Sequence, residues 1–189
     1  YPFESSGLEE PGVEIAEFIN GLDLEQYENV VLIGHSKCGV HFANAAKWIE
    51  DEVIICTVSA PFYGTPIVNA DFQENLNTVV GTVYSVIFSN HNVDKDISPD
   101  STFMANADYT GLEKHTHINV ISTCPKESLN PIDMFLIHLD GQGIDGDGIV
   151  PKKSQQLALE GTITIEIEAT HATSLQKGIE AIKAYIPDL

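Results

Sequence analysis

Four short apolar runs, rich in β-branched residues, alternate with segments of helical periodicity along this 189-residue chain. The runs occupy residues 29–34, 52–59, 117–123 and 162–168. The first two runs are continuous, which is typical of strands that are buried on both faces of a parallel sheet. Parallel neighbours also need a long crossover, usually a helix, between them. The alternation therefore predicts an α/β fold with a mostly parallel sheet flanked by helices.

Apolar residues at three- and four-residue steps predict the helices of this fold, over residues 11–20, 39–49, 72–89 and 174–185. The length fits a single domain over residues 1–189. The segment within about 66–110 is an insertion after the second strand and is a candidate cap or lid. The apolar face of its helix suits either the core or an acyl pocket, and carries Phe72, Val80, Tyr84 and Ile87.

Composition excludes several classes of function. With 28 acidic residues, nine lysines and no arginine, the net charge of -19 disfavours nucleic acid and anionic lipid as partners. No apolar run approaches the roughly 18 residues of a membrane-spanning helix, so stable membrane insertion is not expected. The chain begins at Tyr1, which leaves a processed or incomplete N-terminus and either a cytoplasmic or a secreted location open. No feature of the sequence predicts an oligomeric state.

The cysteines indicate neither a disulfide framework nor a metal site. Cys38, Cys56 and Cys124 are widely spaced, odd in number and form no C-x-x-C pair. We expect each to be a small, buried apolar residue. No cofactor is predicted.

Candidate catalytic residues follow the predicted strands, where active sites of parallel sheets lie. Ser36 follows the first run, His171 follows the fourth, and Asp145 and Asp147 lie between the third and the fourth. A serine nucleophile needs a histidine base, and an acid must hold that base in one tautomer. The order Ser, Asp, His along the chain matches such a triad in this architecture. The alternatives are an N-cap role for Ser36 and a surface position for His171.

The turn around Ser36 has the composition of a sharp strand-to-helix elbow. Such a turn needs small residues two positions before and two positions after the serine. Gly34 meets the first requirement, whereas Cys38 stands where glycine is usual and Gly39 follows it. The backbone N–H of Lys37, at the start of the next helix, is placed to stabilise an oxyanion. We expect the Lys37 amine to face solvent and His35 to pack beside the elbow.

The glycine-rich loop around Asp145 and Asp147 allows two other interpretations. It suits a plain turn, and its oxygen-rich side chains also suit calcium, with Asp140, Gln142 and Asp145 as candidate ligands. The spacing does not match an EF-hand loop, so no metal is predicted.

Several segments resemble α/β-hydrolase lipases and esterases in a consistent order from about residue 28 to residue 175. VVLIGHSKCG is similar to their nucleophile elbow, whose usual form is Gly-His-Ser-x-Gly-Gly. VSAPFYGTPIV and DISPDSTF are similar to the segments around the next two strands, and DGIVPKKS resembles the turn with the catalytic aspartate. The resemblance implies an α/β-hydrolase fold, with Ser36 as nucleophile, Asp147 as acid and His171 as base.

The same resemblance implies a serine hydrolase that cleaves small-molecule or lipid carboxylic esters through an acyl-enzyme. A catalytically silent binding protein of this fold, and a thioesterase or amidase with the same triad, are the alternatives. The family has an earlier strand and a His-Gly loop that supplies a second oxyanion donor, and neither precedes Ser36 here. We therefore expect the N-terminal part of the domain to be absent from this chain, and one missing oxyanion donor costs about 3 kcal/mol.

Overall fold

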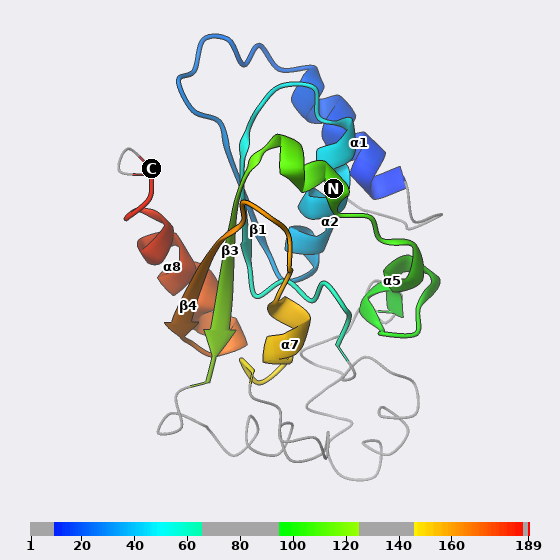
Figure 1. Cartoon of the computed structure of the whole chain (residues 1–189), viewed down its shortest axis with the longest axis vertical. Helices are drawn as coiled ribbons and strands as arrows, with labels where there is room; N and C mark the ends of the chain where they lie inside the picture. Colours follow the sequence, from blue (N-terminus) through cyan, green and yellow to red (C-terminus); the bar gives the residue numbers. More distant parts are fainter. Residues whose placement is uncertain (1–9, 66–94, 125–145, 187–188) are drawn as a thin grey trace.

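The computed structural model describes residues 10–65, 95–124, 146–186 and 189 (Figure 1). The predicted helix at 72–89, with its candidate acyl-pocket face, lies outside the described residues. So do Asp145 and the other two candidate calcium ligands, Asp140 and Gln142. The part of the candidate cap that is described contains a 3-10 turn, η3 (Lys95–Ile97), and a short helix, α5 (Thr102–Asn106).

The described strands form one parallel sheet in the order β1-β2-β3-β4. They are β1 (Val31–His35), β2 (Ile54–Val58), β3 (Thr116–Thr123) and β4 (Ile163–Glu168). Each matches one of the predicted runs to within two residues at either end, because the β-branched residues that fill the runs favour a pleated, buried backbone. All four strands point the same way, so their carboxyl ends meet at one edge of the sheet (Figure 1).

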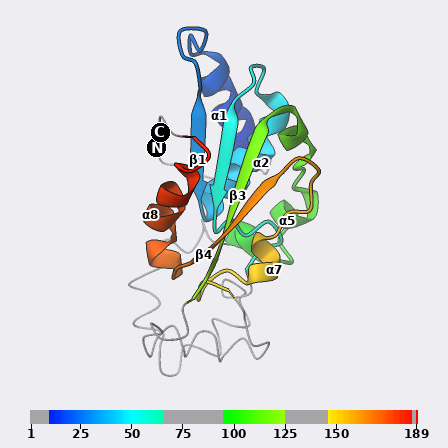
Figure 2. The same cartoon turned by 60° about the vertical axis from the view of Figure 1, so that its left-hand side comes forward.

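Helices cover both faces of this sheet, as Figures 1 and 2 show. On one side lie α1 (Glu10–Asn20) and α2 (Lys37–Ala45), and on the other lies α8 (His171–Ile182). Shorter elements complete the described chain: η1 (Ala46–Trp48), η4 (Thr110–Lys114) and α7 (Lys152–Gln155).

The core divides into two apolar clusters, one on each face of the sheet. The first joins α1 and α2 to the side chain of Ile55 on β2. The second joins Ile182 of α8 to Cys56 and Val58 of β2 and to Val120 of β3. Neighbouring residues of β2 thus enter opposite clusters, which is the two-residue periodicity of a strand that is buried on both faces.

Within the described residues, no helix is both long enough and apolar enough to cross a bilayer.

Candidate active site

Ser36 lies in the turn between β1 and α2, with its backbone held in a rare conformation. Its φ of 55° and ψ of -130° are strained for a residue with a side chain. The backbone N–H of Ser36 donates to the carbonyl of Val58 at 2.9 Å, which fixes the turn to the neighbouring strand. Ser36 occupies the N-cap position of α2, yet its side chain makes no capping hydrogen bond. Its Oγ lies instead 3.0 Å from His171 Nε2.

Two glycines make the turn around Ser36 sterically feasible. A Cβ on Gly34 would lie 2.7 Å from Gly39 Cα and 2.8 Å from the carbonyl oxygen of Cys38. A Cβ on Gly39 would lie 2.8 Å from Ala60 Cβ. The tight contact of the elbow is therefore made by Gly39, three residues after the serine. The expectation that Cys38 is buried is wrong: its side chain is exposed at the turn, and the elbow tolerates it for that reason.

His171 is the first residue of α8, whereas the sequence predicted that it would lie in a loop before a helix starting at 174. The helix begins earlier because Thr170 and Thr173 form a local cap, with the Thr170 N–H donating to Thr173 Oγ1 at 3.2 Å. The His171 N–H donates to the backbone carbonyl of Asp147 at 2.9 Å. Both the helix start and this bond fix the backbone from which the imidazole projects.

Asp147 lies after β3 with its side chain fully buried, and each carboxylate oxygen receives two hydrogen bonds. Oδ1 accepts the backbone N–H groups of Ile149 at 3.0 Å and Val150 at 2.8 Å. Oδ2 lies 2.7 Å from His171 Nδ1 and also accepts from Ser122 Oγ at 3.2 Å. Because a carboxylate can only accept hydrogen bonds, the proton between Asp147 and His171 is carried by His171 Nδ1.

The structure thus brings Ser36, His171 and Asp147 into one hydrogen-bonded line from three separate strand ends. With Nδ1 protonated, the Nε2 of a neutral His171 has a free lone pair directed at the Ser36 hydroxyl. Such an arrangement can remove the serine proton and hold it on the imidazole. His117, in contrast, is buried at the start of β3, and its two ring nitrogens lie 3.0 Å from the hydroxyls of Thr57 and Thr162.

His35 packs against His171, with ring centroids 4.6 Å apart. Its Nε2 lies 3.2 Å from the His171 carbonyl and 3.0 Å from Ser174 Oγ. Since a carbonyl only accepts, His35 Nε2 carries its proton. Burial, and next the nearby His171, lower the pKa of His35, which favours its neutral form. The expectation that His35 packs beside the elbow agrees with these contacts.

Lys37 opens α2 directly after Ser36, so its backbone N–H is at the helix N-terminus. Its amine does not face solvent as expected: the side chain is 16% exposed and its Nζ pairs with Asp96 Oδ2 at 2.9 Å. This ion pair joins the start of α2 to η3.

Three polar residues near Asp147 were not singled out from the sequence as site residues: Ser59, Ser122 and Gln155. All three are fully buried and hydrogen-bonded to one another through Ser122. Their contacts span more than 30 residues of sequence, so no local motif reveals them.

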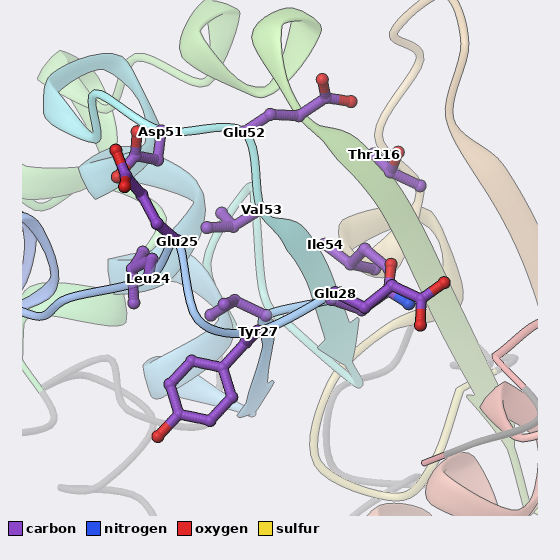
Figure 3. Close-up of a pocket in the computed structure, with 11 residues that line it drawn as sticks. Leu24, Glu25, Tyr27, Glu28, Asp51, Glu52, Val53, Ile54 and Thr116 are labelled. Atoms are coloured by element: carbon purple, nitrogen blue, oxygen red, sulfur yellow. The ribbon is translucent and has the colours of Figure 1, made fainter.

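A groove of about 420 Å³ lies at the opposite edge of the sheet, before the strands begin (Figure 3). Its lining includes four acidic residues from the loops before β1 and β2: Glu25, Glu28, Asp51 and Glu52. It contains none of the residues around Ser36. Across the part of the chain that the structure describes, no three histidine, cysteine or acidic side chains form a group suited to a metal ion.

No family model and no curated protein sequence matches this chain. Among solved structures, the mature form of Bacillus licheniformis lipase BlEst2 is similar, with a TM-score of 0.65 and 15% sequence identity. That likeness covers 95% of this chain and 73% of the lipase chain. The propeptide form of the same lipase gives a TM-score of 0.65 and 14% identity, over 95% of this chain and 40% of that one. At such low identity the likeness concerns the fold, and together with the parallel sheet and its flanking helices it shows that this chain has an α/β-hydrolase fold.

Proposed function

We propose that this protein is a serine hydrolase that cleaves carboxylic esters through an acyl-enzyme on Ser36. The observation that carries the proposal is the pair of distances on His171, 3.0 Å to Ser36 Oγ and 2.7 Å to Asp147 Oδ2. Nucleophile, base and acid in this geometry are the elements of a catalytic triad. The strained φ of Ser36 adds support, because a nucleophile elbow imposes such a backbone.

In the acylation step, Ser36 Oγ attacks the ester carbonyl carbon while His171 Nε2 takes the hydroxyl proton. Asp147 keeps the other proton of the imidazole on Nδ1 and stabilises the resulting imidazolium. The backbone N–H of Lys37 donates to the oxyanion, aided by the dipole of α2. Collapse of the tetrahedral intermediate passes the proton from His171 to the leaving alcohol and leaves the acyl group on Ser36.

In deacylation, a water molecule takes the place of the alcohol. His171 removes a proton from the water as the water oxygen attacks the acyl carbon, and the proton then returns to Ser36 Oγ. The products are the carboxylic acid and the free enzyme. The two solved structures named above are of one lipase, which favours an acyl ester of a lipid or a related small molecule as substrate.

Hydrolysis of a panel of nitrophenyl esters tests the proposal. Wild-type protein should release nitrophenol, and Ser36→Ala should lose this activity. Cys38→Ser is the matched control, because it removes the exposed thiol two residues from Ser36 without touching the triad. Loss of activity in Cys38→Ser with retention in Ser36→Ala would contradict a serine nucleophile. A wild-type protein that cleaves thioesters or amides and not esters would contradict the substrate class.

A further inference from the structure

We propose that Ser122 is a positioning residue that shares Asp147 with His171 and thereby sets how strongly His171 holds a proton. The proposal rests on the function proposed above. Asp147 Oδ2 is the atom that both groups contact, at 2.7 Å from His171 Nδ1 and 3.2 Å from Ser122 Oγ. A second donor on this oxygen withdraws negative charge from the bond with the imidazole.

The single hydroxyl proton of Ser122 is best donated to Asp147. The Ser122 hydroxyl has one proton and lies near Asp147 Oδ2, Gln155 Oε1 at 3.4 Å, and Ser59 Oγ. A carboxylate is the strongest of these acceptors because it is charged. Gln155 Oε1 already accepts the Ser122 backbone N–H at 2.8 Å. The Ser59 hydroxyl can then donate to Ser122 Oγ, which completes a chain from Ser59 through Ser122 to Asp147.

Gln155 fixes both sides of this chain. Its Nε2 donates to the carbonyls of Ser122 and Val150, each at 3.0 Å. Val150 also donates its N–H to Asp147 Oδ1 at 2.8 Å. The fully buried Gln155 amide therefore holds the backbone of Ser122, which donates to Oδ2, and that of Val150, which donates to Oδ1. This bracing leaves the carboxylate little freedom to rotate away from His171.

Backbone strain occurs at both ends of the hydrogen-bonded line. Among the described residues, the non-glycine residues with positive φ are Ser36, at 55°, and Ser59, at 51°. The line runs from Ser36 through His171, Asp147 and Ser122 to Ser59. Strained residues persist where surrounding interactions fix them, and they cluster at functional sites. Ser59, directly after β2, thus belongs to the same polar unit as Ser36, directly after β1.

The consequence is a defined effect on the pH dependence of hydrolysis. Without the Ser122 hydroxyl, the full charge of Oδ2 faces His171 Nδ1–H, and the imidazole binds a second proton more readily. The base is then lost at a higher pH, so the acid limb of the kcat/KM profile moves upward. His35 also faces His171, with ring centroids 4.6 Å apart, and it is unchanged in the variant. Ser59→Gly should also move the acid limb to higher pH, by a smaller amount than loss of the Ser122 hydroxyl does. It should do so although glycine relieves the strain of the positive φ at this position.

The test compares Ser122→Ala with Ser154→Ala in nitrophenyl ester hydrolysis over a range of pH. Ser154 is a matched control, because it is also a buried serine with hydrogen bonds to Gly64 and Tyr63 and none to Asp147. Ser122→Ala should lower kcat/KM about tenfold, because a carboxylate that loses one of its four hydrogen bonds is held less firmly against His171. Its acid limb should rise by about half a pH unit, since a donor to a carboxylate has been removed. Ser154→Ala should lower thermal stability without moving the profile.

Three results would overturn the proposal. One is an unchanged pH profile in Ser122→Ala, and another is an equal shift in Ser154→Ala. The third concerns the double variant Ser122→Ala/Asp147→Asn. If Ser122→Ala lowers kcat/KM as much in the Asp147→Asn protein as in wild type, the proposal is wrong, because a residue that acts through Asp147 should add little there.

A second readout does not depend on activity and separates this proposal from the proposed function. The His171 Nδ1 proton should give a downfield NMR resonance, assigned by its absence in His171→Ala. Ser122→Ala should shift this resonance further downfield, and Ser154→Ala should leave it in place. If wild-type protein hydrolyses no ester, the function fails while this NMR comparison still decides the role of Ser122. An unshifted resonance in Ser122→Ala would overturn that role whether or not the protein is active.

Discussion

Asp147→Asn is the substitution whose effect follows most directly from the structure. The backbone N–H groups of Ile149 and Val150 both need an acceptor at Oδ1, so the asparagine carbonyl should take that position. The amide NH2 then occupies the place of Oδ2, 2.7 Å from His171 Nδ1. Facing a donor, His171 must adopt the tautomer that carries its proton on Nε2. That proton points at Ser36 Oγ, and the base is lost.

The expected magnitude is a fall in kcat of about 10⁴-fold, the usual cost of a wrong histidine tautomer in a triad. It corresponds to about 5.4 kcal/mol of activation free energy, at 1.36 kcal/mol per tenfold change in rate. Stability should change far less, by roughly 1–2 kcal/mol, because the two backbone hydrogen bonds remain.

Asp147→Ala is the comparison variant, because it removes all four interactions of the carboxylate and leaves buried donors unsatisfied. It should lose several kcal/mol of unfolding free energy, since each orphaned donor costs about 1–3 kcal/mol. The assays are nitrophenyl ester hydrolysis and thermal unfolding of wild-type protein and both variants. An Asp147→Asn protein with a kcat within about tenfold of wild type would refute the tautomer argument.

Four further predictions concern the elbow, the turn before β4, the core and the oxyanion donor. Gly34→Ala should cost about 1–3 kcal/mol of stability, because its Cβ would meet three backbone atoms at 2.7–2.8 Å and must displace them. Gly161→Ala, with φ of 82° and open space around it, should cost about 1 kcal/mol in thermal unfolding and leave activity intact. Burial lowers the pKa of His117 to about 4, so the unfolded chain binds its proton first as pH falls. The contribution of His117 to the unfolding free energy should therefore fall by about 2 kcal/mol between pH 7 and pH 5. In denaturant titrations, His117→Gln should make the unfolding free energy depend less steeply on pH. Lys37→Ala keeps the backbone N–H and should stay within a few-fold of wild-type kcat, whereas a loss near 10³-fold would assign catalysis to the amine.

The sheet was predictable because its strands are specified locally. β-branched runs of five to eight residues leave few alternatives to buried strands, and the crossovers between them favour parallel pairing. Ser36 and His171 could be singled out for a related reason. Each follows a strand directly, and the carboxyl ends of parallel strands converge.

What could not be predicted depends on contacts between distant segments. The start of α8 was misplaced because the Thr170–Thr173 cap lacks the glutamate or glutamine of the usual capping box. Lys37 was expected in solvent because its partner, Asp96, lies 59 residues away. Ser59 and Ser122 look like ordinary polar residues at strand ends. Only the folded chain places the Ser122 hydroxyl beside Asp147 and the Ser59 hydroxyl beside Ser122.

The proposed hydrolysis depends most on Ser36 being an activated nucleophile. The most direct measurement is reaction with a fluorophosphonate, followed by mass spectrometry of the intact protein and of its peptides. We expect one covalent adduct, located on Ser36, that is absent from Ser36→Ala and strongly reduced in His171→Ala. A wild-type protein that remains unlabelled, or a Ser36→Ala protein that is still labelled, would contradict a nucleophilic Ser36.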